Sequence, residues 1–262
     1  MEVSHEEVKK MKKRFLMIVL MMVAMVTAGI GSAFAADKVF INGIDANYPP
    51  FSYIDETGKP DGMDVKAVEW IAKEMGFKVK HQPTDWAAII PSLKAKKIDL
   101  IASGMSVTPE RLQEVNFTQS YHKTVMMLVV KKDSDLTVDA CKEGEMQWGI
   151  QRGTSEAQWV EENLIKKGKK FTLHHYDSAP LAMEDLVNGR IQCTVASEIS
   201  AREAMDKGLP IKTIGRYGQP DDETAYAVRR EDADLLKMLN EGLTKLMATP
   251  YWKELNEKYK VH

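Results

Sequence analysis

The stretch Ile98–Arg111, IDLIASGMSVTPER, decides the fold of this 262-residue chain. Its first five residues are mostly apolar, which is typical of a buried strand. Small and hydroxyl residues follow, and then Thr108 and Pro109 suit the N-cap and the first position of a helix. A buried strand that leads through a short loop into a helix is part of a βαβ unit, so the stretch predicts an α/β fold.

The same alternation continues on the N-terminal side of this stretch. Strand-like runs at residues 38–43 and 77–81 alternate with helical patterns at residues 63–76 and 86–96. In the first helical pattern the apolar residues recur on one face, and Gly76 is suited to end the helix. Strands interleaved with helices of this length favour a mostly parallel sheet.

A second block repeats this organisation from residue 148 to residue 197. Residues 148–151, 171–176 and 191–197 have strand character, and helical patterns separate them. Ser155 is expected to cap the first of these helices, with Gln158 completing a capping box. Residues 93–103 and 186–197 each place Leu five residues before Ile and end on Ala-Ser, a weak internal similarity that indicates two lobes built alike.

The remaining segments suggest how the two lobes are joined. Residues 124–132 form a long apolar run that suits a crossing from one lobe to the other. The C-terminal helical pattern, with Leu235, Leu239, Leu243 and Met247 at one face, is too short to form a lobe alone. We therefore predict lobe 1 from residues 36–124 and 220–262 and lobe 2 from residues 125–219, with two crossing strands as a hinge.

The N-terminus has the features of a secretory signal peptide over residues 1–35. A basic segment precedes an apolar run, and Ala33-Phe34-Ala35 matches a cleavage site. The alternative, a membrane anchor, is disfavoured because the apolar run is short for a bilayer span of about 20 residues. Either Met1 or Met11 is the start. We expect a periplasmic protein.

Composition and motifs narrow the functional classes. The formal net charge of −2 gives no sign of a nucleic-acid partner. Cys141 and Cys193 are free to form a disulfide in an oxidising compartment, but the sequence does not decide it. His174 and His175 are adjacent in a strand and face opposite sides, so they do not share a metal. We predict no metal, no cofactor and no catalytic residue.

The stretch quoted first also predicts a site for a small anion. Ligands of α/β sheets bind beyond the carboxyl ends of strands, where the loop before Thr108 would lie. The free N–H groups of a helix start favour anions, and Arg111 adds a guanidinium that grips a carboxylate with two hydrogen bonds. The alternative is that Arg111 pairs with a neighbouring carboxylate of the protein.

Four segments together resemble a known family. Residues 43–65, 85–111, 115–121 (VNFTQSY) and 151–155 (QRGTS) are similar to the periplasmic amino-acid-binding proteins of ABC importers, solute-binding protein family 3. The resemblance covers nearly the whole chain after the signal. It implies a type II fold with a ligand cleft between two α/β lobes, no enzymatic activity, and delivery of the ligand to an inner-membrane permease. We expect a monomer.

The resemblance also implies site residues in both lobes. Arg111 would hold the ligand carboxylate, and Trp86 would form a wall against the ligand side chain. Core packing is the alternative for Trp86. The other positions that match ligand-contacting residues are Asp45, Tyr48, Ser103, Gly104, Ser106, Thr154 and Ser155.

Three further positions bear on the ligand. Ser197 stands where relatives have an aspartate that receives the ligand's ammonium group, so Glu198 or Asp45 would have to compensate, or the ligand lacks that group. Arg152 would face a second carboxylate, or is a solvated loop residue. These features favour a polar or acidic amino acid, with a dicarboxylate receptor or a sensor module as alternatives.

One enzyme uses a similar scaffold, the cyclohexadienyl dehydratase. It has a tryptophan at the position of Trp86, but its acidic residue aligns with Ser200 of this chain. The dehydratase is therefore the less favoured alternative.

Overall fold

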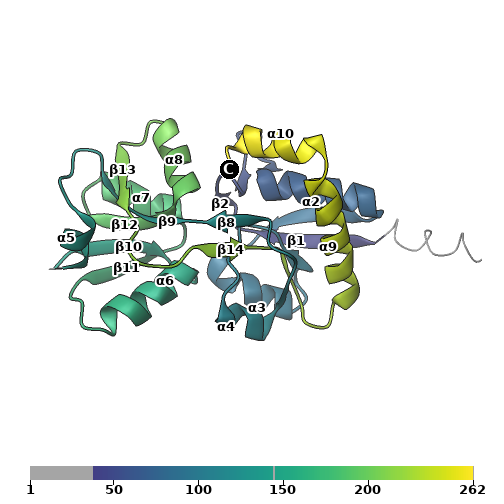
Figure 1. Cartoon of the computed structure of the whole chain (residues 1–262), viewed down its shortest axis with the longest axis horizontal. Helices are drawn as coiled ribbons and strands as arrows, with labels where there is room; N and C mark the ends of the chain where they lie inside the picture. Colours follow the sequence, from purple (N-terminus) through teal and green to yellow (C-terminus); the bar gives the residue numbers. More distant parts are fainter. Residues whose placement is uncertain (1–37, 144, 262) are drawn as a thin grey trace, which may run out of the picture.

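The computed structural model describes residues 38–143 and 145–261. Two five-stranded sheets form the centres of two lobes that lie end to end along the long axis of the molecule (Figure 1). Helices pack around both sheets, so the predicted two-lobed α/β fold is confirmed. The predicted signal peptide lies outside the described residues. Across the described ranges, every helix is too short or too polar to span a bilayer.

The first lobe is built on the strand order β5-β1-β6-β15-β7. Strand β1 runs parallel to β5 and β6, whereas β15 runs antiparallel to β6 and β7. A small sheet, β2-β3-β4, extends the loop after β1. The elements are β1 (Val39–Ile44), β2 (Asn47–Tyr48), β3 (Ser52–Ile54), β4 (Pro60–Asp61), α2 (Met63–Met75), β5 (Lys78–Pro83), η1 (Trp86–Ala88), α3 (Ile89–Lys94), β6 (Leu100–Ile101), α4 (Pro109–Glu114), β7 (Asn116–Phe117), β15 (Ala227–Val228), α9 (Ala233–Met247) and α10 (Pro250–Tyr259).

The second lobe repeats this plan with the strand order β11-β10-β12-β9-β13. Strand β10 runs parallel to β11 and β12, and β9 runs antiparallel to β12 and β13. The elements are β9 (Met126–Lys131), α5 (Val138–Lys142), β10 (Gln147–Gln151), α6 (Ser155–Val160), η2 (Glu161–Ile165), β11 (Thr172–Tyr176), α7 (Ala179–Val187), β12 (Cys193–Ser197), α8 (Glu198–Asp206) and β13 (Ile211–Gly215).

Two antiparallel strands connect the lobes. Strands β8 (His122–Thr124) and β14 (Asp222–Thr224) pair with each other and lie between the two large sheets (Figure 1). The buried hydroxyls of Thr124 and Thr224 lie 2.8 Å apart and join the two strands. The assignment of residues 36–124 and 220–262 to one lobe and 125–219 to the other stays a prediction.

The apolar patterns read from the sequence for α2 and α9 hold with one exception. Val65, Val68 and Ile71 of α2 are fully buried, and Gly76 ends the helix at a φ of 76°. In α9 the expected apolar face is buried except for Met247, which is 39% exposed. Leu246 is buried in its place because Met247 is the last residue of the helix.

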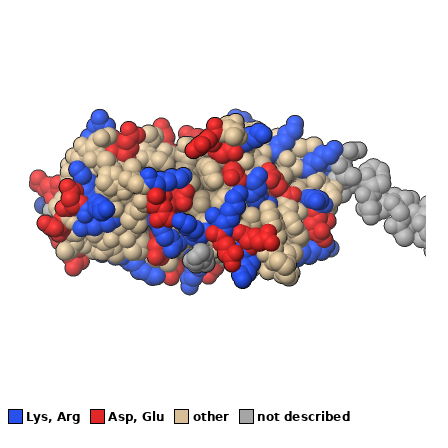
Figure 2. Space-filling model, turned by 90° about the horizontal axis from the view of Figure 1, so that it is seen from above, with Lys and Arg blue, Asp and Glu red and all other residues tan. Residues whose placement is uncertain are grey.

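The two cysteines lie in the core of the second lobe. Cys141 and Cys193 are both buried and free, and they belong to the same apolar cluster. At the surface, Figure 2 shows basic and acidic side chains interspersed over one face of the molecule, in line with the small net charge.

Candidate functional site

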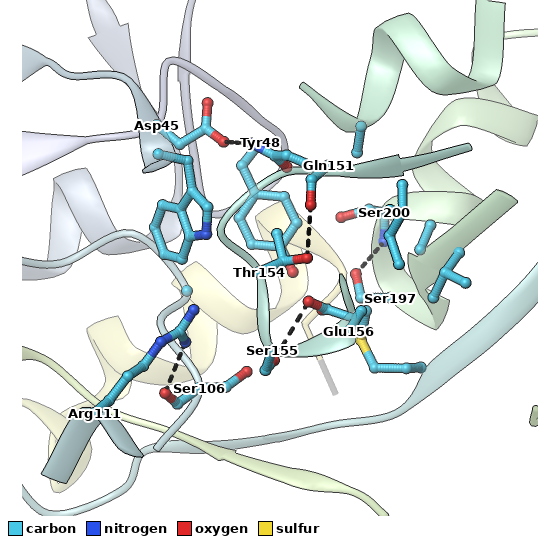
Figure 3. Close-up of a pocket in the computed structure, with 17 residues that line it drawn as sticks. Asp45, Tyr48, Ser106, Arg111, Gln151, Thr154, Ser155, Glu156, Ser197 and Ser200 are labelled. Atoms are coloured by element: carbon cyan, nitrogen blue, oxygen red, sulfur yellow. Dashed lines mark hydrogen bonds between the residues drawn. The ribbon is translucent and has the colours of Figure 1, made fainter. Parts of the chain in front are cut away.

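A pocket between the lobes collects residues from the carboxyl ends of strands in both sheets (Figure 3). The loops after β1, β5 and β6 line it from the first lobe, and those after β10, β11 and β12 line it from the second. This is where an α/β sheet places its ligand. Nine of the predicted site residues line the pocket: Asp45, Tyr48, Trp86, Gly104, Ser106, Arg111, Thr154, Ser155 and Ser197.

Arg111 is a buried cation on the wall of this pocket. Thr108 caps α4 by accepting a hydrogen bond from the Arg111 N–H, as the sequence predicts, and Pro109 takes the first helical position. The guanidinium donates from Nη1 to the Ser106 carbonyl at 2.9 Å and from Nη2 to the Gly153 carbonyl at 3.2 Å. Arg111 is thereby held from both lobes.

The guanidinium of Arg111 has no ionic partner within the described part of the chain, where no carboxylate lies within ion-pair distance of it. Burial lowers its pKa, and the more distant charges of Glu156 and Asp222 oppose that shift. When a buried cation is hydrogen-bonded only to carbonyls, these bonds offset only part of the free-energy cost of removing its charge from water. The arrangement suits an incoming anion.

Trp86 forms one wall of the pocket and also packs in the core. It is 8% exposed and belongs to a cluster with Ile89, Leu93 and Met105. The Arg111 guanidinium lies 5.5 Å from the centre of the indole ring, which is within cation–π range. The indole N–H is buried without a hydrogen-bond partner among the described residues. Trp86 therefore combines a place in the pocket wall with core packing, and its N–H is left as an unused donor.

Asp45 and Gln151 join the two lobes across the pocket. Gln151 donates from Nε2 to Oδ2 of Asp45 at 2.7 Å (Figure 3). The other carboxylate oxygen accepts from the Asn47 N–H at 2.9 Å. Burial raises the pKa of Asp45, and these two hydrogen bonds oppose the shift. The Asp45 carboxylate is thus committed to contacts within the protein.

Ser103 lies behind the pocket instead of lining it. Its hydroxyl accepts from the Asp45 N–H at 2.9 Å and bonds the Ser52 hydroxyl at 2.7 Å. It does not line the pocket as predicted, because its hydroxyl is turned toward the Asp45 loop and Ser52. Ser103 therefore orders the loop that carries Asp45.

The N–H of Gly104 is also used within the protein. Although Gly104 lines the pocket, its N–H donates to Oδ2 of Asp64 at 2.6 Å, and Tyr121 donates its hydroxyl to the same oxygen at 2.8 Å. Asp64 is fully buried. It holds the loop that leads to Arg111, and the predicted hydrogen bond from Gly104 to a ligand is not supported.

Asp64 makes the stability of the fold depend on pH. Burial raises its pKa from 3.8 to about 7, against the hydrogen bonds of Tyr121 and Gly104. The folded protein thus binds a proton that the unfolded chain releases, so this group lowers the free energy of unfolding as pH rises from about 4 to 7, at about 1.4 kcal/mol per pH unit. The loss levels off above pH 7.

Asp64→Asn should remove this dependence, because an amide oxygen still accepts the two hydrogen bonds. Urea unfolding at about pH 4.5 and 7 should show a drop in stability about 3 kcal/mol larger in the wild type than in the variant. Equal drops in the two proteins would contradict the protonation of buried Asp64.

Thr154 and Ser155 begin helix α6 in the second lobe. The N-cap is Thr154, whose hydroxyl accepts from the Ala157 N–H, and not Ser155 as the sequence suggested. Ser155 instead donates its hydroxyl to Asp222 of the connecting strand β14 at 3.0 Å. The expected capping box is therefore wrong, because the helix starts one residue earlier.

Ser197 ends β12 and caps helix α8. Its hydroxyl accepts from the Ser200 N–H at 3.1 Å (Figure 3). Burial raises the Tyr48 pKa, and the nearby hydroxyls of Ser197 and Ser200 oppose this shift. Ser200 donates its own hydroxyl to the Pro49 carbonyl at 2.9 Å, a further contact between the lobes.

Two further predicted residues lie outside the pocket, in addition to Ser103. Glu198 is exposed and faces a separate surface depression with His122 and Arg202, because it is the first residue of α8 and projects away from the strand end. Arg152 is exposed, pairs with Asp177 at 3.2 Å and donates to the His175 carbonyl. Neither the compensating acid at Glu198 nor the second cationic contact at Arg152 is present.

The sequence reasoning missed three polar residues of the pocket. Gln151, Glu156 and Ser200 all line it. Gln151 and Glu156 flank the Gly-Thr-Ser turn, so their place at the carboxyl end of β10 was a usable signal. No group of three or more His, Cys, Asp or Glu side chains suited to a metal occurs in residues 38–143 and 145–261.

Comparison with known proteins agrees with this geometry. The family model described as bacterial extracellular solute-binding proteins, family 3, matches residues 40–262. The L-arginine-binding protein of Pseudomonas aeruginosa is 30% identical over 233 residues, which cover 86% of this chain and 89% of that protein. The histidine-binding periplasmic protein of Escherichia coli is 31% identical, with 87% and 90% covered. These relatives are binding proteins and not enzymes.

A solved structure bears on the dehydratase alternative. It is an ancestral amino acid-binding protein described as a precursor of cyclohexadienyl dehydratase, with a TM-score of 0.77 and 28% identity over 84% of this chain and 95% of that chain. The position that the sequence resemblance aligns with the enzyme's acidic residue is Ser200, and Glu198 faces away from the pocket. Fold, pocket and sequence agree: the chain belongs to the bacterial extracellular solute-binding proteins of family 3, the amino-acid-binding proteins of ABC transporters.

Proposed function

We propose that this protein captures one amino acid between its lobes, with Arg111 receiving the ligand carboxylate, and delivers it to an inner-membrane ABC permease. The observation that carries the proposal is the buried guanidinium that faces the pocket without an ionic partner among the described residues. A carboxylate in the pocket would accept two parallel hydrogen bonds from it. The unpartnered indole N–H of Trp86 offers a further donor.

The charges around the pocket favour a polar amino acid over an acidic one. Asp45 and Glu156 line the pocket, and Arg111 is the one basic side chain among its described lining residues. A second ligand carboxylate would face these two acids without a cation, because Arg152 points elsewhere. The ligand is therefore an α-amino acid with a neutral or cationic side chain, which disfavours the acidic and dicarboxylate alternatives.

Closure of the lobes gives the binding mechanism. Gln151 to Asp45, Arg111 to Gly153 and Ser200 to Pro49 are hydrogen bonds between opposite sides of the pocket. A ligand that contacts both walls binds the closed arrangement better than an open one, and it shifts the equilibrium toward closure. The signal peptide predicted at residues 1–35 would deliver the protein to the periplasm, where a permease meets it.

A thermal-shift screen tests this function. The purified mature protein is mixed with each standard L-amino acid, and with succinate as the dicarboxylate. A ligand at 100 times its dissociation constant stabilises by about 2.7 kcal/mol, which raises the melting temperature by about 5–10 °C for a protein of this size. We expect such a shift with a neutral polar or cationic amino acid. No shift with any amino acid, or a shift with succinate alone, would overturn the proposal.

A further inference from the structure

Glu156 is a second charged group on the wall of the pocket that holds Arg111. It follows Thr154 and Ser155 at the start of α6 and is half-buried. The Ser155 hydroxyl lies 3.3 Å from its carboxylate (Figure 3), but it is closer to Asp222, at 3.0 Å. Within the described residues no lysine, arginine or histidine lies within ion-pair distance of it. The carboxylate therefore lacks a cationic partner.

Arg111 and Glu156 are close enough to influence each other without touching. Burial raises the pKa of Glu156, and the Arg111 charge acts in the opposite direction. Both side chains line the same pocket, yet they form no ion pair. Opposite charges held apart across a partly desolvated space suit a ligand that carries both charges. An α-amino acid has its carboxylate and its ammonium on one carbon.

Glu156 shares the pocket wall with Tyr48 and with Ser197 at the end of β12. Burial raises the Tyr48 pKa, and the nearby charge of Glu156 raises it further. Ser197 itself carries no charge, and its hydroxyl is engaged by the Ser200 N–H. Glu156, at the start of α6, thus places an acid in the pocket although β12 ends on the uncharged Ser197.

Asp45, the other acid of the pocket, is less suited to an ammonium group. One of its oxygens accepts from Gln151 at 2.7 Å and the other from the Asn47 N–H at 2.9 Å. An ammonium would have to compete with these contacts, and the first of them helps to join the lobes. Within the described residues the Glu156 side chain makes no hydrogen bond to the opposite lobe, since its contact is with the adjacent Ser155.

We propose that Glu156 receives the ammonium group of the bound amino acid, while Arg111 receives its carboxylate. This assignment rests on the function proposed above. It makes Glu156 a specificity-determining residue, which separates α-amino acids from carboxylic acids of the same shape that lack the amino group.

The test compares Glu156→Gln with the wild type on matched ligands. The probes are L-arginine and 5-guanidinopentanoate, then L-histidine and 3-(imidazol-4-yl)propanoate. If the screen gives another amino acid, that ligand and its analogue without the α-amino group are used. Calorimetry should show that Glu156→Gln weakens the amino acid about 100-fold. The analogue should bind the variant within about threefold of the wild type, because it has no ammonium for Glu156 to contact.

Glu110→Gln is the matched control. Glu110 also lies near Arg111, but it is exposed and does not line the pocket, so this variant should keep the wild-type affinity for the amino acid. The melting temperature of ligand-free Glu156→Gln should not fall, because burial already disfavours the ionised carboxyl.

Two results would overturn the assignment. Glu156→Gln that binds the amino acid as tightly as the wild type shows that Glu156 does not contact the ammonium. Equal weakening of the amino acid and its analogue shows that Glu156 acts on the carboxylate or on the shape of the pocket. In both cases the wild type still binds an amino acid, so the proposed function survives. A wild type that binds no amino acid defeats both proposals.

Discussion

Arg111→Ala is expected to lower the affinity for the bound amino acid about 1000-fold or more. The ligand carboxylate would then be enclosed without a cation, and truncating one partner of a buried charge pair costs about 2–5 kcal/mol or more. The variant also loses the hydrogen bond to the Gly153 carbonyl that joins the lobes. Calorimetry with the amino acid from the screen measures the change.

The control for this variant is Arg152→Ala. It deletes the same side chain from an exposed position on the second lobe, where Arg152 pairs with Asp177, and its affinity should match that of the wild type. Ligand-free Arg111→Ala should stay within about 1–2 kcal/mol of the wild-type stability. An unchanged affinity of Arg111→Ala in a folded protein would refute the role given to this residue.

Gly153→Ala is expected to weaken ligand binding about 10- to 100-fold by obstructing closure. A Cβ atom at Gly153 would lie 2.8 Å from the Cα atom of Ala87 on the opposite lobe. This is closer than Cβ atoms in proteins approach other heavy atoms. This overlap exists only when the lobes are together, so it costs the closed state more than an open one. Ligand affinity falls by that difference.

Gly168→Ala separates this obstruction from backbone strain. Gly153 has a φ of 75° and Gly168 a φ of 91°, so alanine is strained by about 1–2 kcal/mol at either position. A Cβ atom at Gly168 meets nothing within 4 Å. Both variants should lose similar stability without ligand, and only Gly153→Ala should lose affinity. Equal affinities in calorimetry would show that the two loops do not need to meet.

The sequence predicts most of the first lobe's contribution to the pocket. The cap at Thr108, the proline at the helix start and Arg111 in its first turn form one local pattern, and the structure repeats it residue by residue. Trp86 was predicted as a wall of the pocket, with core packing as the alternative, and the structure combines the two. Local chemistry suffices here because neighbours in the sequence form the site.

Side-chain direction at the edges of the elements was harder to predict. Ser103 turns inward to order the Asp45 loop, and Glu198 points away from the pocket as the first residue of α8. Arg152 turns to Asp177 on the outer surface. In each case the residue is next to the pocket in sequence, but a shift of one position at a strand end or a helix start reverses the direction of a side chain.

Gln151 and Glu156 were missed for a different reason. Their roles depend on groups more than 40 residues away in the chain, Asp45 for Gln151 and Arg111 for Glu156. In the sequence alone Glu156 is an ordinary acid in the first turn of a helix, where such residues are common. Its place in the pocket becomes apparent only in the fold, where the carboxyl ends of the two sheets face each other.

The three hydrogen bonds that span the pocket have a consequence for unloading. Those from Gln151, Arg111 and Ser200 run directly between groups of the protein, with no solute atom as an intermediary. When the ligand leaves, these three hydrogen bonds still join the two lobes. Each of them contributes about 0.5–1.5 kcal/mol, so together they favour the closed arrangement by a few kcal/mol and slow the release of the ligand.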